Sequence, residues 1–385
     1  MKKWESYIGK QKSEYTRVCY PEDFNAGMVV VIPCYNEPDI EETLESLRDC
    51  HRPEVNVLVA IVINSSVLTD DAVVLQNRKT YNELKRFSQK YDDRGLSFFT
   101  VLFEQLPRKH AGVGLARKIG MDMAVAHFIR NGTRDGVIVS LDADCLVSKN
   151  YLTDIFTAFQ RDPRLYSTIH QFRHRVERDD PILKRGIQQY EAYLRYFREM
   201  LKFTGFPYYY HTIGSAFAVL ADAYVKVGGM GRQQGGEDFY FLQKLFEAGK
   251  TMELDNVVVY PLARYSDRVP FGTGPALEKI MQGADQRMEV YSKCSFLELK
   301  RLFDLVDDFY ELEIDEIEAV INTLHPSLSS YLDEIAFREM IRDCKGNSAR
   351  LVTFRKRFFH HFNAFRIIKY LNFVHPDPFP LEHIT

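Results

Sequence analysis

The stretch that decides the fold reads Gly136-Val137-Ile138-Val139-Ser140-Leu141-Asp142-Ala143-Asp144. Its first six residues are apolar or small, which is typical of a strand buried on both faces of a sheet. In an extended backbone, residues i and i+2 project to the same side, so we expect Asp142 and Asp144 to point one way from the strand end. Such a pair suits a divalent cation that also holds a diphosphate. Loop aspartates that cap a helix or bind water produce the same short pattern.

Short apolar runs alternate with helical patterns through the first two-thirds of the chain. Buried strands separated by helices predict a mostly parallel sheet covered on both faces, with ligands bound beyond the carboxyl ends of its strands. The expected strands are 28–32, which Pro33 ends, 57–63, 97–103, 137–141 and 215–220. The expected helices are 40–50, 72–91, 115–130, 188–202, 221–227 and 237–248.

From residue 275 onward strand patterns give way to helical ones, which sets the domain organisation. We predict an α/β fold with an N-terminal extension at 1–27, an α/β domain at 28–268 and a C-terminal helical region at 269–385. The chain is long enough for one large domain or two ordinary ones.

Composition narrows the class of protein. A formal net charge of −3 gives no reason to expect a nucleic-acid partner. The six cysteines are scattered, which fits reduced thiols better than disulfides or a zinc site. The start lacks an apolar signal run, and no run approaches the roughly 20 apolar residues that span a bilayer. We therefore expect a cytoplasmic protein, at most peripheral at the inner face of a membrane.

Several motifs follow one another in a fixed order along the first two-thirds of the chain. This succession resembles the family 2 glycosyltransferases with the GT-A fold, over roughly residues 28–250. The segments that carry the resemblance are 32–37 (IPCYNE), 112–117 (GVGLAR), Asp142-Ala143-Asp144, Gly214-Ser215, Gly228-Gly229 and 235–238 (GGED).

The resemblance implies a nucleotide-sugar donor and assigns residues to it. Pro33, Tyr35, Asn36 and Glu37 match the first-strand motif that lines the nucleotide pocket. Arg117 matches the helix start that approaches the donor, although arginine and lysine at such a place are ordinarily solvated on the surface. Family members commonly read the nucleobase with an aspartate pair after the second strand. This chain has Asn64-Ser65-Ser66 there, which keeps a possible base contact through Asn64 but weakens the assignment of uridine.

The resemblance also assigns the metal and the base. Asp142 and Asp144 match the Asp-x-Asp motif that holds a metal and the donor diphosphate, with Asp144 the direct ligand of Mn²⁺ or Mg²⁺. Asp238 matches the carboxylate that acts as base on the acceptor hydroxyl, and Glu237 is its neighbour. Acids in the first turn of a helix also complement the helix dipole, which is the alternative interpretation of this pair.

Two segments outside these motifs have two interpretations each. The loop 264–274 contains Arg264 and Arg268, which either close over the donor diphosphate as charge clamps or belong to an ordinary linker. The basic stretch 350–369 has phenylalanines at helical spacing. It is either an interfacial membrane helix or a helix that packs its apolar stripe on the α/β domain, with its basic face near the acidic stretch 304–318.

The sequence thus predicts a metal-dependent glycosyltransferase that moves one sugar to an acceptor hydroxyl, with inversion expected from the family. The acceptor is a carbohydrate, a lipid-linked molecule or a small molecule. The chain lacks both a membrane span and the Gln-x-x-Arg-Trp element of processive members, which favours single additions. The alternatives are a retaining enzyme of the mannosylglycerate-synthase kind and a catalytically silent sugar-nucleotide-binding scaffold.

Overall fold

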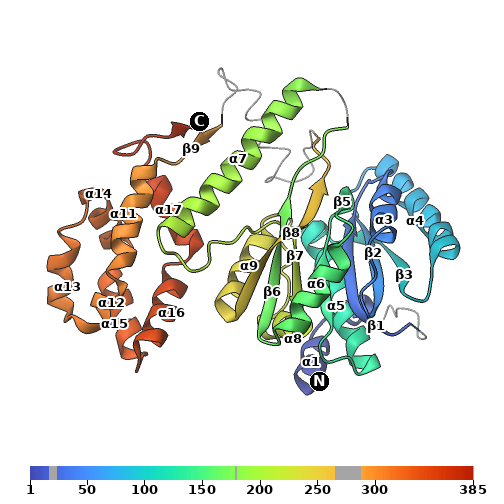
Figure 1. Ribbon diagram of the computed structural model, residues 1–385, viewed down its shortest axis with the longest axis horizontal. Coiled ribbons are helices and arrows are strands. Elements are labelled where there is room, and N and C mark those ends of the chain that lie inside the picture. Colours follow the sequence, from blue (N-terminus) through green and yellow to red (C-terminus); the bar gives the residue numbers. More distant parts are fainter. Residues whose placement is uncertain (17–23, 178–179, 265–287, 385) are drawn as a thin grey trace. The chain divides into compact units, whose positions relative to one another are not determined.

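The computed structural model describes residues 1–16, 24–177, 180–264 and 288–384 (Figure 1). The chain forms two compact units. The α/β unit comprises Met1–Asp180 and Thr212–Pro275, and the helical unit comprises Pro181–His211 and Ala276–Thr385. The predicted class, an α/β fold with a mostly parallel sheet and a C-terminal helical region, is confirmed. The predicted domain boundary at residues 268 and 269 lies outside the described residues and stays a prediction.

An eight-stranded sheet in the order β3-β2-β1-β4-β7-β6-β8-β5 forms the centre of the α/β unit. The first four strands of this order are parallel to one another. β7 runs antiparallel to β4 and β6, and β5 runs antiparallel to β8. The strands are β1 Ala26–Cys34, β2 Asn56–Ser66, β3 Leu96–Leu106, β4 Val137–Ser140, β5 Cys145–Val147, β6 Leu165–Phe172, β7 Phe217–Leu220 and β8 Lys250–Pro261.

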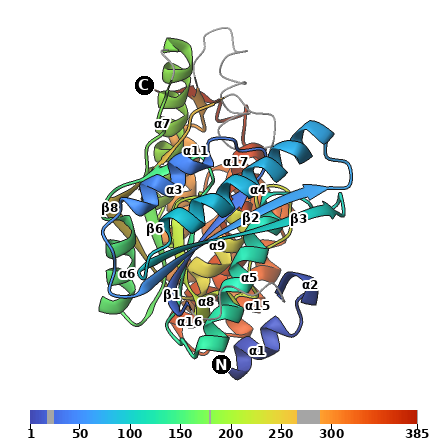
Figure 2. The ribbon, with the colours of Figure 1, turned by 90° about the vertical axis from the view of Figure 1, so that its right-hand side faces the viewer.

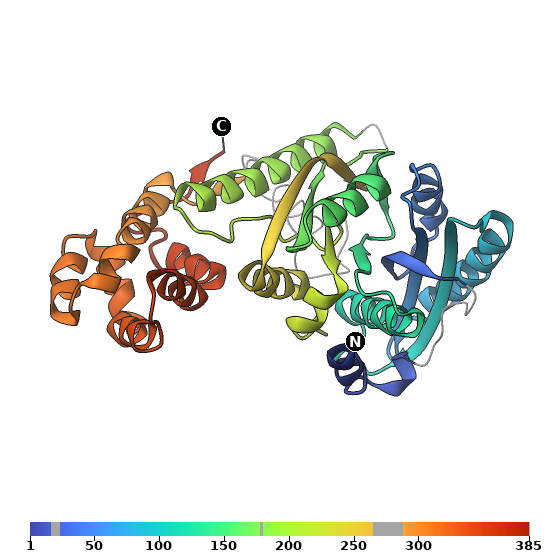
Figure 3. The ribbon, with the colours of Figure 1, turned by 60° about the horizontal axis from the view of Figure 1, so that its bottom comes forward.

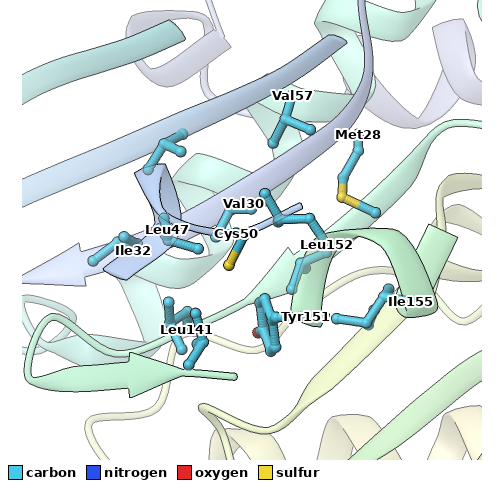
Figure 4. Close-up of a cluster of buried hydrophobic side chains, with 14 of the residues drawn as sticks. Met28, Val30, Ile32, Leu47, Cys50, Val57, Leu141, Tyr151, Leu152 and Ile155 are labelled. Atoms are coloured by element: carbon cyan, nitrogen blue, oxygen red, sulfur yellow. The ribbon is translucent and has the colours of Figure 1, made fainter. Parts of the chain in front are cut away.

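The helices of the α/β unit lie on both faces of the sheet. Figure 2 shows α3 and α4 on one side of β1, β2 and β3, and α5 on the other. Even-numbered residues of β1 pack toward α3 and α6, as Figure 4 shows for Met28, Val30 and Ile32. Val31 faces α5 instead, where a side chain at Gly120 would collide with it. The helices are α1 Lys2–Ile8, α2 Ser13–Thr16, α3 Ile40–Arg48, α4 Asp71–Tyr91, α5 Val113–Asn131, α6 Tyr151–Arg161, α8 Ala221–Lys226 and α9 Glu237–Ala248.

β1 extends two residues further than its sequence predicts, through Pro33 to Cys34. The carbonyl oxygen of Val31 accepts a hydrogen bond from the nitrogen of Leu141. The backbone N–H and C=O groups of the odd-numbered residues of β1 therefore point toward β4. The register of β4 on β1 ends at Ser140 opposite Val31. Pro33 therefore lies past the last β4 pair, where its missing N–H leaves no bond unmade.

The N-terminal segment includes a helix that packs on the α/β unit. The indole nitrogen of Trp4 in α1 donates to Asp222 of α8 at 3.0 Å. The hydroxyl of Tyr7 donates to Asp122 of α5 at 2.8 Å, and the amino group of Lys118 donates to Tyr7 at 3.1 Å. Trp4 is 2% exposed. α1 is therefore part of the folded α/β unit.

The helical unit contains the long helix α7, a set of shorter helices and a two-stranded ribbon of β9 and β10 (Figure 3). None of the helices in the described part of the chain is long and apolar enough to cross a bilayer. The elements are α7 Pro181–Phe203, β9 Glu289–Val290, α11 Lys293–Asp304, α12 Val306–Glu311, α13 Ile314–Ile321, α14 Pro326–Glu334, α15 Phe337–Gly346, α16 Leu351–His361, α17 Ala364–Phe373 and β10 Glu382–His383.

The basic stretch 350–369 forms two helices, α16 and α17, instead of one. Phe354, Phe358 and Phe362 are fully buried. Their rings contact other aromatic rings of the helical unit, including Phe303. These three rings thus pack inside their own unit, whereas Phe365 is exposed. The basic stretch meets the acidic stretch through an ion pair between Arg355 and Asp307.

Candidate active site

The predicted metal motif lies in a turn at the carboxyl end of β4. The nitrogen of Cys145 donates to the carbonyl oxygen of Asp142 at 3.2 Å, so the backbone bends immediately after the strand. The expectation that both aspartates project from an extended backbone is therefore wrong. The charge of Asp142 nevertheless raises the pKa of Asp144. Burial is the largest cause, and the pKa of Asp144 is raised to about 6.

Arg117 connects this turn to the acidic start of α9. Its guanidinium donates to Asp142 at 2.8 Å through Nη2 and pairs with Glu237 through Nη1. The side chains of Arg117 and Glu237 are 3% and 2% exposed. Arg117 is thus buried, not solvated on the surface. The neighbouring Lys118 is also buried, in an ion pair with Asp122 at 2.8 Å.

Two glycines make room for the Arg117 connection. A Cβ on Gly214 would lie 2.8 Å from Nη2 of Arg117. A Cβ on Gly114 would lie 2.2 Å from the carbonyl oxygen of Gln233 and 3.0 Å from Cγ of Glu237. The glycine turn before α5 therefore lets the starts of α5 and α9 approach closely, which brings Arg117 and Glu237 together.

The predicted base, Asp238, follows Glu237 in the first turn of α9. Its carboxylate accepts a hydrogen bond from the nitrogen of Phe239 at 2.8 Å. Burial raises the pKa of Asp238, and the positive charge of Arg117 opposes that shift. The charge of Asp142 also raises the pKa of Asp238, so the two carboxylates interact electrostatically. Burial likewise raises the pKa of Glu237.

Arg264 is the second arginine that contacts the predicted site residues. Its Nη1 donates to Glu37 Oε2 at 3.0 Å, and its Nη2 donates to Asp144 Oδ2 at 2.9 Å and also to Glu37. Residue 145 of β5 is registered opposite residue 261 of β8, and the nitrogen of Leu262 donates to the carbonyl oxygen of Asp144. These backbone contacts bring Arg264 beside the metal motif. The other predicted clamp, Arg268, lies outside the described residues.

The predicted nucleotide-pocket residues lie at the ends of β1 and β2. Tyr35 is 38% exposed, and Asn36 has a φ of 53°. The nitrogen of Asn36 donates to the side chain of Asn77 in α4 at 2.9 Å. The amide of Asn64 donates to the carbonyl oxygen of Gly112 at 3.0 Å. Asn64 therefore links the end of β2 to the turn before α5, and its contact with a nucleobase stays a prediction.

The sequence did not reveal two of the residues that shape this site. Asn77 is 1% exposed and joins the end of β1 to α4. The sequence feature that could have identified Asn77 is a polar residue on the buried side of a helix, one turn before Thr80 and two turns before Leu84. Gln234 bonds to the carbonyl oxygens of Arg108 and Ala111 and so ties the segment before α9 to the segment before α5. Nothing in its local sequence indicates that role.

A cavity of about 430 Å³ lies beyond the ends of β2 and β3. The hydroxyl of Ser65 is buried and has no hydrogen-bond partner among the described residues. The polar lining residues are Ser65, Ser66, Thr69, Asp71, Arg78, Glu104 and Gln105. Its place at the carboxyl ends of parallel strands is where such sheets bind ligands.

The acids around Asp144 offer the kind of oxygen ligand that a divalent cation takes. Arg117 and Arg264 bond to four of these acids, Glu37, Asp142, Asp144 and Glu237, and Asp238 is the fifth. Their carboxylate oxygens are the hard ligands that Mg²⁺ and Mn²⁺ prefer.

Among the described residues, the group of three ligand atoms that lie close together is Asp343, Cys344 and His361, in the helical unit. Both oxygens of Asp343 are bonded to Arg357, at 2.8 and 3.0 Å, and one also contacts His361. We therefore interpret that group as an ion-pair network.

Solved structures of the TarS protein of S. aureus are similar to this chain. A structure of its residues 1–349 in complex with UDP-GlcNAc is 14% identical, covers 86% of this chain and 91% of that chain, and has a TM-score of 0.43. The corresponding complex with UDP is 15% identical, covers 86% and 90%, and has a TM-score of 0.41. No curated protein matches the chain.

A sequence model of glycosyl transferase family 2 matches residues 29–228, from within β1 to the first of the paired glycines after α8. The match includes the Asp142-Ala143-Asp144 turn and Arg117, and it covers more than half of the 385 residues. The chain therefore belongs to glycosyl transferase family 2 and is a glycosyltransferase.

Proposed function

We propose that the protein transfers a single sugar from a nucleotide-sugar donor to an acceptor hydroxyl, with a divalent cation and with inversion at the anomeric carbon. The observation that carries this proposal is the pairing of one buried arginine, Arg117, with both Asp142 and Glu237. That pairing joins the turn that would hold the metal to the helix that would hold the base. A transferase needs these two groups at one anomeric carbon.

The donor is proposed to bind across the ends of β1, β2 and β4. The first of these strands contains Pro33 near its end and is followed by Tyr35, Asn36 and Glu37. The cavity beyond β2 and β3 offers hydroxyl and charged side chains on the same side of the sheet. A ligand with a polar base, a ribose and a diphosphate fits such a series of polar groups.

Asp144, with Asp142 beside it, is the proposed holder of Mn²⁺ or Mg²⁺. When bound, such a cation offsets the negative charge that grows on the departing diphosphate. Arg117 fixes the position of Asp142 through a 2.8 Å bond, so that carboxylate is oriented before any ligand arrives.

Asp238 is the proposed base. Its raised pKa makes the carboxylate of Asp238 a stronger proton acceptor than an ordinary aspartate. It accepts the proton of the acceptor hydroxyl as the new glycosidic bond forms and the bond between sugar and diphosphate breaks. Attack from the face opposite the diphosphate gives inversion.

A hydrolysis and transfer assay with a panel of nucleotide sugars and Mn²⁺ tests this function. The wild type is expected to release nucleoside diphosphate from one donor class. Asp238→Asn is expected to lower turnover by roughly 100- to 10,000-fold, the usual value of general-base catalysis, while donor binding persists. Asp135→Asn, at an exposed position on the loop before β4, is the matched control and should retain full activity.

The same assay separates the alternatives. Silence of the wild type with every donor, together with binding of a nucleotide sugar, would support a sugar-nucleotide-binding scaffold. A product that keeps the anomeric configuration of the donor would refute inversion and support a retaining transferase.

A further inference from the structure

Arg264 is bonded to one carboxylate oxygen of Asp144, the proposed metal ligand. Its Nη2 lies 2.9 Å from Asp144 Oδ2 and is shared with Glu37, whereas its Nη1 contacts Glu37 Oε2 at 3.0 Å. The side chains of Glu37 and Asp144 are 7% and 21% exposed. The guanidinium thus supplies positive charge to two acids that have little solvent around them.

The backbone around Arg264 is held in place, so only its side chain needs to move. The nitrogen of Leu262 bonds to the carbonyl oxygen of Asp144 at 3.1 Å, and the nitrogen of Ala263 bonds to the carbonyl oxygen of Arg175 at 2.8 Å. Ala263 itself is 4% exposed. Arg264 follows this anchored pair directly and is 31% exposed on its side chain.

We propose that Arg264 is the resident counter-ion of Asp144 and must release that carboxylate when a divalent cation binds, after which its guanidinium pairs with the donor diphosphate. This inference rests on the proposed function, because it assumes that Asp144 is the metal ligand. Arg264 is then a positioning residue that makes metal loading a competition between two cations for one carboxylate.

Two physical arguments support this exchange. A guanidinium and a divalent cation on the same carboxylate repel each other, and in a partly buried site that repulsion is poorly screened. Glu37 supplies a second partner through both Nη1 and Nη2, so Arg264 can leave Asp144 without losing all its bonds. A planar guanidinium released beside a metal matches the bidentate geometry of phosphate oxygens.

The test is Mn²⁺ binding to the full chain without donor, measured by electron paramagnetic resonance of free Mn²⁺. Arg264→Gln is expected to bind Mn²⁺ at least tenfold more tightly than the wild type, because the competing charge is gone. Arg264→Lys, which keeps the charge but loses the fork, should stay near the wild type. Arg164→Gln removes a surface arginine that is 84% exposed and is the matched control. Circular dichroism of each variant confirms its fold.

Asp144→Asn separates failure of this inference from failure of the proposed function. If Asp144→Asn weakens Mn²⁺ binding but Arg264→Gln binds no more tightly than the wild type, the competition is refuted and the metal site stands. If Asp144→Asn changes nothing, the metal assignment itself is wrong. If the wild type binds no Mn²⁺, binding by Arg264→Gln supports the inference and its absence overturns it.

A second measurement examines the released guanidinium. At saturating Mn²⁺, UDP and GDP are titrated against the wild type and Arg264→Gln. Loss of the arginine is expected to weaken whichever nucleotide binds by at least tenfold. Equal affinities would show that Arg264 does not reach the diphosphate.

Discussion

Replacing Arg117 with methionine tests the connection that organises the site. Methionine keeps much of the side-chain volume and removes the charge. It leaves Glu237, whose side chain is 2% exposed, as an unpaired carboxylate in the interior. Removing one partner of a buried ion pair typically costs about 3–5 kcal/mol. We expect a loss in that range, with the larger share from Glu237, because Asp142 is 37% exposed and can be hydrated.

Urea denaturation followed by tryptophan fluorescence measures this loss. Trp4 is the single tryptophan of the sequence and is buried in α1, so its emission reports unfolding of the α/β unit. The double variant Arg117→Met, Glu237→Gln should recover part of the loss, since the unpaired charge of Glu237 is also removed. Arg78→Met, which breaks an exposed pair with Glu104, should leave the midpoint unchanged.

The stability of Arg117→Met should also be measured as a function of pH. Without Arg117 the carboxyl of Glu237 takes up a proton more readily, so the loss of stability should shrink as the pH falls. A loss below about 1 kcal/mol at neutral pH would contradict the view that this pair is a desolvated connection. A full loss in the double variant would show that packing of the Arg117 side chain, not its charge, is what matters.

Three further outcomes follow from the structure. Burial raises the pKa of Asp144 to about 6, so that carboxylate is protonated below this pH. The affinity for Mn²⁺ should therefore be constant above about pH 7 and fall about tenfold per pH unit at lower pH. An affinity that does not change between pH 5 and 7 would exclude Asp144 as the metal ligand. Tyr7→Phe removes the hydroxyl that bonds to Asp122 and Lys118 and should cost about 1–3 kcal/mol by the Trp4 assay. No change in stability would mean that the Tyr7 hydroxyl does not help to hold α1. Phe358→Ala opens a cavity among buried rings and should cost about 3–5 kcal/mol of stability, measured by thermal unfolding followed by far-ultraviolet circular dichroism, whereas Val352→Ala, at an exposed position, should cost little. Equal melting temperatures of the two variants would argue against a packed core in the helical unit.

Much of the sheet could be predicted because its strands are continuous apolar runs. β1 and β2 are buried on both faces, so apolar residues follow one another without interruption. β6 was missed because polar residues interrupt it. The hydroxyl of Ser167 pairs with that of Thr251 at 2.8 Å across to β8, a partner 84 residues away. Such a pair satisfies the buried polar groups and hides the strand from a search for apolar runs.

Some residues of the site could likewise be predicted from the sequence, whereas the roles of others depend on contacts with distant residues. Asp142 and Asp144 could be proposed because they follow a recognisable strand end, and Asp238 because its motif stands in the order typical of the family. The burial of Arg117 could not, because it depends on Glu237, 120 residues further along, and on the absence of a side chain at Gly214. Helix α1 was also missed, since seven residues are too few for a periodic pattern and its stability comes from contacts with α5 and α8.

The space shared by Arg117 and Gly214 has an evolutionary consequence. Because the guanidinium fills the volume that a Cβ at position 214 would take, neither residue can be exchanged freely while the other stays. Among related chains, we expect these two positions to covary. Lineages that retain the arginine at position 117 should retain the glycine at position 214. Those that have lost the arginine should tolerate alanine or serine at position 214.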